Sequence, residues 1–172
     1  RGLYAEALQF FGKALDRQSS FARARYYQGL AELQLGEPGK AEKDLNLSSY
    51  DLSFYAAAHY ELARLAASQG RLERALEHIE RSIRGNADNA QARAVKALIL
   101  NRLGRHEEAL AAATEVQDTD PLDFLSLAER VKAFEQLGRQ EKAEALRDTF
   151  LAVTRSSSEN HLELAIRYAP VS

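Results

Sequence analysis

The stretch ARLAASQGRLERALEHI, residues 63–79, decides the fold of this protein. From Ala63 onward the apolar residues recur at three- and four-residue spacing, and the same period resumes after Gly70 through Ala75 and Ile79. This spacing is that of an α-helix with one apolar face. Glycine adopts the left-handed backbone that ends a helix without a steric penalty. The stretch therefore predicts two helices joined by a tight turn at Gly70.

The same hairpin pattern recurs along the chain with a period of 34 residues. Glycine stands at positions 2, 36, 70, 104 and 138, and alanine stands five residues after each of them. Small residues at these sites let two helix backbones approach closely, because a larger side chain would overpack the contact. The register predicts a second helix alone in 1–21, whole repeats in 22–55, 56–89, 90–123 and 124–157, and a first helix alone in 158–172. We call the helix before each repeat glycine the first helix and the helix after it the second helix.

The composition agrees with a helical protein and excludes several classes of partner. Alanine and leucine make up nearly a third of the 172 residues, and both favour helix. The 23 basic and 25 acidic residues nearly cancel, so no net charge attracts nucleic acid or an anionic membrane. No charge-free stretch is long enough to cross a membrane. The absence of cysteine excludes disulfides and fits a reducing compartment, so we expect a cytoplasmic protein.

Residues that carry chemistry are few and scattered. The histidines at 59, 78, 106 and 161 show no pair at the spacing of a helical zinc site, and His59 and His161 hold a repeat position that partly faces the partner helix. The run 156–158 is a linker and a helix cap rather than a nucleophile, and the glycines form no phosphate-binding loop. We therefore expect no metal, no cofactor and no enzymatic activity.

The period, the glycine, the alanine five residues later and Asp120-Pro121 at a repeat end resemble the tetratricopeptide repeat (TPR) family over essentially the whole chain. The resemblance implies an all-α, right-handed superhelical solenoid of helical hairpins, whose first helices line a concave groove that binds a peptide or protein. One departure is clear. The bulky aromatic residue usual at the fourth position of the first helix is replaced by Arg25, His59, Arg93 and Leu127.

In the family, the second, fifth, ninth, twelfth and thirteenth positions of the first helix face the groove. Carried over, these positions give the candidate protein-binding residues Arg23, Tyr26, Leu30, Tyr60, Arg64, Gln91, Asn101 and Lys132. Tyrosine beside arginine is typical of a protein-binding surface, but packing of Tyr26 and Tyr60 between adjacent hairpins is an equally open interpretation. Binding of a C-terminal carboxylate is disfavoured, because Tyr26 and Leu30 stand where that subclass has lysine and asparagine.

A weaker resemblance concerns the parent protein. The stretches 81–86, 92–97, 103–105 and 120–124 are similar to the repeat region of large bacterial proteins that carry an uncharacterised, possibly carbohydrate-processing domain. Arg1 is neither methionine nor a small residue, and we expect the chain to be part of a longer one. Two functions are therefore weighed: a scaffold that binds a separate peptide or protein, and a repeat region that packs on its parent's enzymatic domain or self-associates through its ends.

Overall fold

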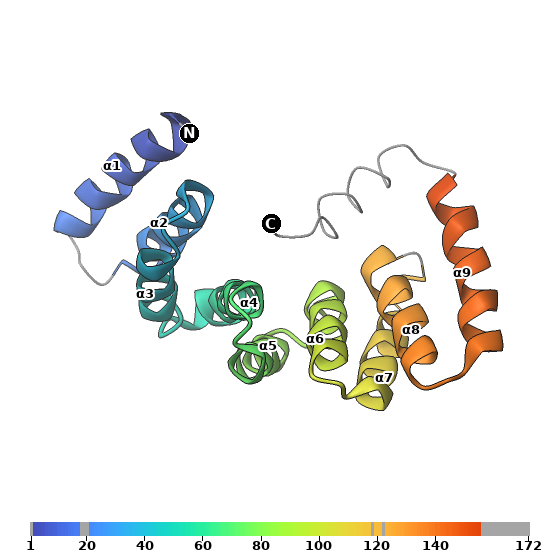
Figure 1. Ribbon diagram of the computed structural model, residues 1–172. Helices are drawn as coiled ribbons and strands as arrows, with labels where there is room; N and C mark the ends of the chain where they lie inside the picture. The colour runs from blue at the N-terminus through green and yellow to red at the C-terminus, as the bar shows by residue number, and fades with distance from the viewer. Residues whose placement is uncertain (1, 18–20, 118, 122, 156–172) are drawn as a thin grey trace. The chain divides into compact units, whose positions relative to one another are not determined.

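The computed structural model folds into α-helices joined by short turns (Figure 1). It describes residues 2–17, 21–117, 119–121 and 123–155. The helices are α1 (Gly2–Arg17), α2 (Ala22–Leu35), α3 (Pro38–Ser48), α4 (Leu52–Ser68), α5 (Leu72–Gly85), α6 (Ala90–Arg102), α7 (His106–Gln117), α8 (Phe124–Gln136) and α9 (Gln140–Arg155). These residues contain no strand, and the predicted all-α class of helical hairpins is confirmed. The expected C-terminal helix with His161, and the serine run before it, lie outside the described residues.

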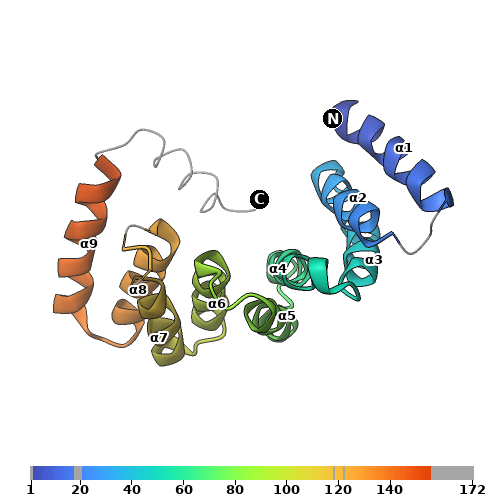
Figure 2. The ribbon, with the colours of Figure 1, turned by 180° about the vertical axis from the view of Figure 1, so that it is seen from behind.

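The helices form two compact units, unit 1 (Arg1–Ala92) and unit 2 (Arg93–Ser172). In unit 1, α1 packs on α2, α2 on α3 and α4 on α5, and the view from behind shows the α4–α5 pair side by side again (Figure 2). In unit 2, α7 packs on α8 and α8 on α9. The repeat boundaries given above stay a prediction. Among the described helices, none combines the length and the apolar character needed to cross a membrane.

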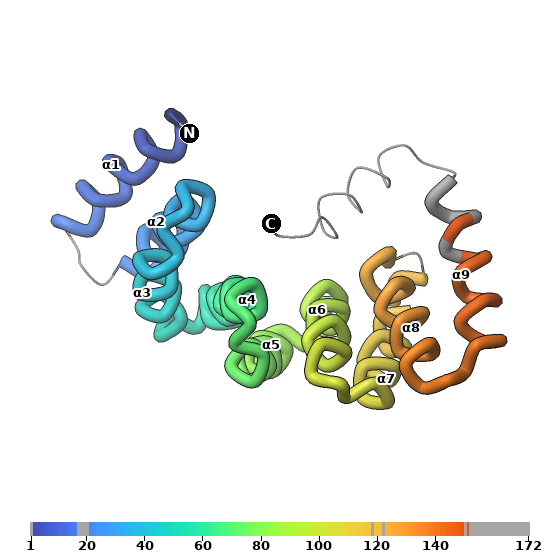
Figure 3. The backbone as a smooth tube through the Cα atoms, in the orientation of Figure 1, coloured from blue at the N-terminus to red at the C-terminus, as the bar shows by residue number. Residues whose placement is uncertain are grey.

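A glycine with left-handed backbone geometry lies in the turn after each of the first helices α2, α4, α6 and α8. The repeat glycines Gly36, Gly70, Gly104 and Gly138 have φ between 71° and 79°. At the turn from α4 to α5, the Arg71 backbone N–H donates to the Ala66 carbonyl at 2.9 Å, which satisfies a carbonyl that the helix end leaves open. This geometry lets the backbone reverse within a few residues, as the tube in Figure 3 shows.

Small residues hold the two helices of each hairpin close together. The alanines five residues after these glycines, at 41, 75, 109 and 143, are completely buried. On the opposing helix α2, a Cβ added to Gly29 would lie 2.8 Å from Leu45 Cγ and 3.3 Å from the Ala41 carbonyl oxygen. There is no room for a side chain at this crossing, so glycine at 29 and alanine at 41 set the spacing of α2 and α3.

Two of the residues that replace the usual aromatic at the fourth position of the first helix, Arg25 and His59, form polar contacts with the second helix of their own hairpin. Arg25 Nη1 lies 2.5 Å from Asp44 Oδ1, and His59 Nδ1 lies 3.0 Å from His78 Nδ1. Asp44, His59 and His78 are all buried. In unit 1 each hairpin thus replaces an apolar aromatic contact by a polar pair between its own two helices. Leu127, at the same position in unit 2, stays apolar and is 2% exposed.

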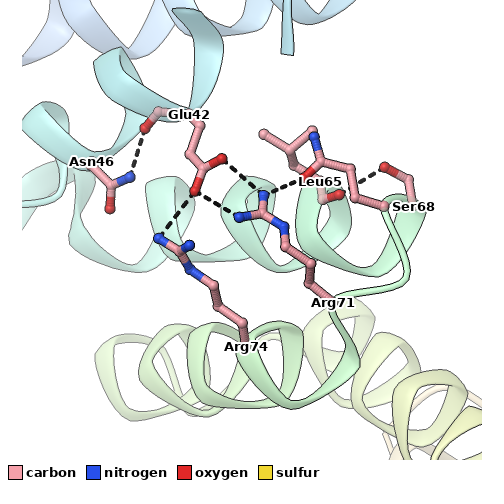
Figure 4. A network of polar contacts seen from close by, with 7 residues as sticks. Glu42, Asn46, Leu65, Ser68, Arg71 and Arg74 are labelled. Atoms are coloured by element: carbon pink, nitrogen blue, oxygen red, sulfur yellow. Dashed lines mark hydrogen bonds and ion pairs between the residues drawn. The ribbon is translucent and has the colours of Figure 1, made fainter. Parts of the chain in front are cut away.

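Ion pairs link a second helix to the start of the next second helix and the turn before it. In unit 1, Glu42 of α3 accepts from Arg71 at 2.8 and 3.1 Å and from Arg74 at 3.0 Å (Figure 4). The hydrogen bonds from Arg71 lower the pKa of Glu42 and outweigh the opposing effect of burial. In unit 2, Arg139 lies 2.5 Å from Glu107. These half-exposed pairs fix the register of neighbouring hairpins more than they add to the free energy of unfolding.

Gly70→Val is expected to lower the free energy of unfolding by at least about 1 kcal/mol, because a β-branched residue resists the left-handed backbone. A Cβ at Gly70 meets no atom within 4 Å, so the loss isolates the backbone effect. The matched control is Gly39→Val, since Gly39 lies in helix α3 with the same open space around it and no positive φ. Urea unfolding followed by circular dichroism measures both. An equal effect of the two substitutions contradicts the prediction.

Candidate functional site

A groove of about 690 Å³ lies in unit 1, between α1, α2 and α4. This volume falls in the range of ligand-binding sites in proteins. Most of the side chains that line it are apolar or aromatic. They are Tyr4, Ala7 and Phe11 of α1, Tyr27, Leu30, Ala31, Leu33 and Gln34 of α2, and Glu61, Arg64, Leu65 and Ser68 of α4.

Helix periodicity brings these residues to one surface. Leu30 and Gln34 lie one turn apart on α2, and Glu61 and Leu65 lie one turn apart on α4, so each pair points the same way. The start of α4 is fixed by Asp51, whose side chain accepts a hydrogen bond from the Ser53 backbone N–H at 2.8 Å. The cap therefore sets where α4 begins.

Aromatic rings from three helices form a cluster, of which Phe11 and Tyr27 line the groove. The Phe11 and Tyr27 rings stack with centroids 6.1 Å apart, and Tyr26 lies 5.4 Å from Tyr27 and 5.3 Å from Phe54. Burial, followed by the negative charge of Glu61, raises the pKa of Tyr26 above its usual value, so this ring stays neutral. Tyr27 is nonetheless 46% exposed. The cluster offers an apolar, partly solvent-facing surface that gains free energy when a partner covers it.

The two charges in the groove, Glu61 and Arg64, neutralise each other. Arg64 Nη1 lies 3.1 Å from Glu61 Oε2, and its guanidinium lies 5.7 Å from the centre of the Tyr60 ring. Burial raises the pKa of Glu61, and the Arg64 charge opposes that shift. The groove thus combines an arginine beside a tyrosine ring with no net charge of its own.

The structure brings together four of the eight candidate residues. Tyr26, Leu30, Tyr60 and Arg64 lie on α2 and α4 of unit 1, and Leu30 and Arg64 line the groove itself. Tyr26 and Tyr60 are half-buried next to it, and the Tyr26 ring packs on Phe54. Arg23 and Gln91 are exposed in unit 1 but do not line the groove.

Asn101 and Lys132 belong to unit 2. Asn101 is only 4% exposed, and its amide nitrogen donates to the Glu129 carbonyl and carboxylate at 2.8 Å each. Its Oδ1 lies 3.0 Å from His106 Nδ1. All polar atoms of this side chain are used inside unit 2, so the expectation that Asn101 faces a ligand is corrected. Lys132 is exposed.

Tyr4, Phe11 and Tyr27 line the groove but are not among the candidate residues that the family pattern indicates. Tyr27 holds the sixth position of the first helix, which the family pattern does not assign to the groove. Tyr4 and Phe11 lie on α1, which carries second-helix positions, whereas the family pattern places groove residues on first helices only. The available signal was aromatic content, since these residues belong to a run of rings in the first 27 residues of the chain.

The His59–His78 pair is a second polar feature of unit 1. The residues are 4% and 6% exposed, and they join α4 to α5. At 3.0 Å between the Nδ1 atoms, one neutral ring donates its N–H and the other accepts. Within the part of the chain that the structure describes, no three histidine, cysteine or acidic residues gather as a metal site would require. The pair is a buried contact between the two helices of this hairpin.

The comparison with protein families identifies the repeats. The model of the Psidin N-terminal TPR repeats region matches residues 66–169, and a tetratricopeptide repeat model matches residues 1–57. The chain belongs to the tetratricopeptide repeat family. A curated relative, the rat (Rattus norvegicus) N-alpha-acetyltransferase 25, NatB auxiliary subunit, is 29% identical over 102 residues. The match covers 59% of this TPR chain but only 10% of the rat protein, so the chain spans about a tenth of that relative's length.

Solved structures show the same fold. A crystal structure of MamA superposes with a TM-score of 0.83 at 19% identity, covering 92% of each chain. MamA from Desulfovibrio magneticus RS-1 gives 0.83 at 17% identity, covering 92% of this chain and 89% of that one. YrrB, described as a TPR protein with an unusual peptide-binding site, gives 0.76 at 21% identity, covering 94% and 83%. At these identities the likeness establishes the fold alone.

The histidine pair makes the stability of unit 1 depend on pH. Burial first, and then the positive charges of His78, Arg81 and Arg84, lower the pKa of His59 to about 4. Burial also lowers the pKa of His78, helped by Arg81 and Arg74 and opposed by Glu77 and Glu42. The unfolded chain therefore binds more protons than the folded one between about pH 6.5 and pH 4, and stability falls as the pH falls through this window.

We expect the free energy of unfolding to drop by about 1–2 kcal/mol more between pH 7 and pH 5 in the natural chain than in the double variant His59→Gln/His78→Gln. Glutamine keeps a hydrogen-bonding side chain at both sites but does not titrate. His106→Gln, in unit 2, is the control, and its free energy of unfolding is expected to fall between pH 7 and pH 5 as much as that of the natural chain. Urea unfolding at several pH values measures the slopes, and parallel curves for the natural chain and the double variant rule the effect out.

Proposed function

We propose that this TPR chain is a protein-interaction scaffold that binds a peptide or protein segment in the groove of unit 1. The observation that carries the proposal is the groove itself, which the rings of Tyr4, Phe11 and Tyr27 line together with the paired charges of Glu61 and Arg64. Tyrosine and arginine are the residues that most often supply binding energy at protein interfaces, because they bury large surfaces while satisfying polar atoms. The groove holds both on rigid helices.

The chemistry of the groove favours a ligand with apolar side chains and little net charge. Leu30, Leu65 and Ala31 contribute apolar surface to the groove, while Gln34 and Ser68 contribute hydrogen-bonding groups. The description of YrrB as a peptide-binding TPR protein supports this class of ligand. The rat relative is an auxiliary subunit, which is the kind of accessory role that a scaffold fulfils. We assign no catalytic role to this chain.

The alternative function keeps the repeats as a structural region that packs on an enzymatic domain of the parent chain or self-associates. The exposed apolar residues Leu3 and Phe10 of α1, at 82% and 71% exposure, are compatible with it. Light scattering on the isolated chain tests the self-association part of this alternative, because a monomer at all concentrations excludes it. A bacterial source and a cytoplasmic location stay predictions from the sequence.

The double variant Tyr60→Ala/Arg64→Ala is expected to raise the dissociation constant of groove ligands at least about tenfold, because it removes a ring and its stacked cation. The ligands are peptides selected with the natural chain from a random display library, and fluorescence polarisation measures their binding. The matched control is Tyr50→Ala/Arg84→Ala, which removes the same residue types from exposed positions away from the groove. Equal binding by both variants, or a library that yields no ligand, contradicts the proposal.

A further inference from the structure

Three large apolar residues are exposed where the chain passes from α3 to α4, and we call them the apolar patch. Leu47 of α3 is 41% exposed, Tyr50 in the turn is 86% exposed, and Leu52 at the start of α4 is 91% exposed. The Asp51 backbone N–H donates to the Ser48 carbonyl at 3.1 Å, so a tight turn holds these side chains in one short segment. None of the three lines the groove.

The 34-residue period shows that the three patch positions face solvent throughout the chain. No other repeat carries a large apolar residue at any of them. The position of Leu47 is held elsewhere by Lys13, Arg81, Glu115 and Thr149, that of Tyr50 by Asp16, Arg84, Asp118 and Ala152, and that of Leu52 by Gln18, Asn86, Asp120 and Thr154. Those whose exposure the structure describes are all exposed. A position that neighbouring repeats cover would be apolar in every repeat, so packing within the repeats does not account for the patch.

Lysines on the same face of α3 give the patch a positive edge. Lys43 stands four residues before Leu47, and Lys40 stands three residues before Lys43, which is the spacing of neighbours on one helix face. All three residues are exposed. Lys40 Nζ lies 2.8 Å from Glu37 Oε2, whereas Lys43 forms no ion pair with any residue that the structure describes. Lys43 is therefore a cation available to a partner.

The acidic residue inside the patch segment is already engaged. Asp51 is the one acidic residue between Leu47 and Leu52, and its side chain accepts from the Ser53 backbone N–H at 2.8 Å as the cap of α4. A partner's carboxylate thus gains an uncompensated lysine, while a partner's cation gains no open acceptor. Charge complementarity favours a partner that carries acidic residues next to apolar ones.

The same features disfavour a second copy of the chain as the occupant. In a symmetric dimer formed through the patch, Lys43 of one copy would approach Lys43 of the other, because the same surface meets itself. Like charges brought together at an interface lower the affinity. A stable interface also involves about 20 to 30 residues on each side, more than the patch and its lysines supply. A short segment needs only a few anchoring side chains.

We propose that the apolar patch binds a segment of a partner protein that places apolar side chains on Leu47, Tyr50 and Leu52 and an acidic residue beside Lys43. A tyrosine ring buries a large surface while its hydroxyl keeps a hydrogen bond, which suits Tyr50 as the anchor. The patch is a second interaction surface. It goes beyond the groove and does not depend on the function proposed for it.

The test selects peptides from a random display library for binding to the natural chain and against binding to the triple variant Leu47→Arg/Tyr50→Arg/Leu52→Asn. This variant carries the residues that the next repeat has at the same exposed positions, so it is expected to fold like the natural chain. Circular dichroism melting checks the fold. The selection is expected to yield peptides that combine apolar with acidic residues.

Fluorescence polarisation then measures the selected peptides on single variants. Tyr50→Ala is expected to raise their dissociation constant at least about tenfold, because it removes the anchoring ring. The groove variant Tyr60→Ala/Arg64→Ala is the control and is expected to leave their binding unchanged. The proposal is overturned if the selection yields no peptide, or if Tyr50→Ala binds as tightly as the natural chain.

A charge reversal tests the acidic part of the partner. Lys43→Glu is expected to raise the dissociation constant about two- to fivefold, the size of one exposed ion pair. Peptides whose acidic residues are replaced by lysine are expected to bind the natural chain more weakly and to regain affinity on Lys43→Glu. Lys142→Glu, an exposed position of α9, makes the same change as a control. Equal effects of Lys43→Glu and Lys142→Glu contradict an acidic partner.

Two further measurements identify other occupants, and each overturns the proposal. Sedimentation that shows self-association of the natural chain but not of the triple variant assigns the patch to a second copy. Co-sedimentation of the natural chain, but not of the triple variant, with vesicles of phosphatidylcholine and phosphatidylserine assigns it to a membrane surface. The groove is judged separately, since its ligands respond to Tyr60→Ala/Arg64→Ala and not to Tyr50→Ala. Either surface can therefore fail without the other.

Discussion

The close approach of two helix backbones within each hairpin is the constraint on which the rest of the structure depends. The left-handed glycine turns the chain back on itself, and the fully buried alanine five residues later lets the second helix lie directly on the first. At Gly29 the approach is so close that a single added carbon would meet Leu45 at 2.8 Å. Because interiors are packed to the density of organic crystals, this contact fixes the positions of both helices rather than merely favouring them.

The close packing of the two helices limits which side chains fit at the fourth position of each first helix. With the backbones held together, the space usually taken by one aromatic ring is shared by two polar side chains, as in Arg25–Asp44 and His59–His78. Such pairs are costly to bury unless each partner is satisfied, and a mispaired hairpin would leave a buried polar group alone. Each pair is satisfied within its own hairpin, while the alanines and leucines around it supply most of the burial.

The same constraint explains where the groove lies. In the α2–α3 and α4–α5 hairpins, the faces of α3 and α5 are covered by their first helices, so nothing remains there for a ligand. The groove lies instead where Tyr4, Ala7 and Phe11 of α1 meet residues of α2 and α4, and the Phe11 ring stacks on Tyr27.

The sequence by itself determined the helices, their turns and the small-residue contacts, because a 34-residue period in glycine and alanine encodes local geometry that each hairpin repeats. It also indicated four of the groove-side residues, Tyr26, Leu30, Tyr60 and Arg64, through the family pattern. Only the tertiary structure decided that Asn101 is buried against Glu129, and that Tyr4, Phe11 and Tyr27 line the groove. The physical reason is that a repeat pattern specifies contacts within a hairpin, whereas exposure depends on which neighbouring helix covers each face.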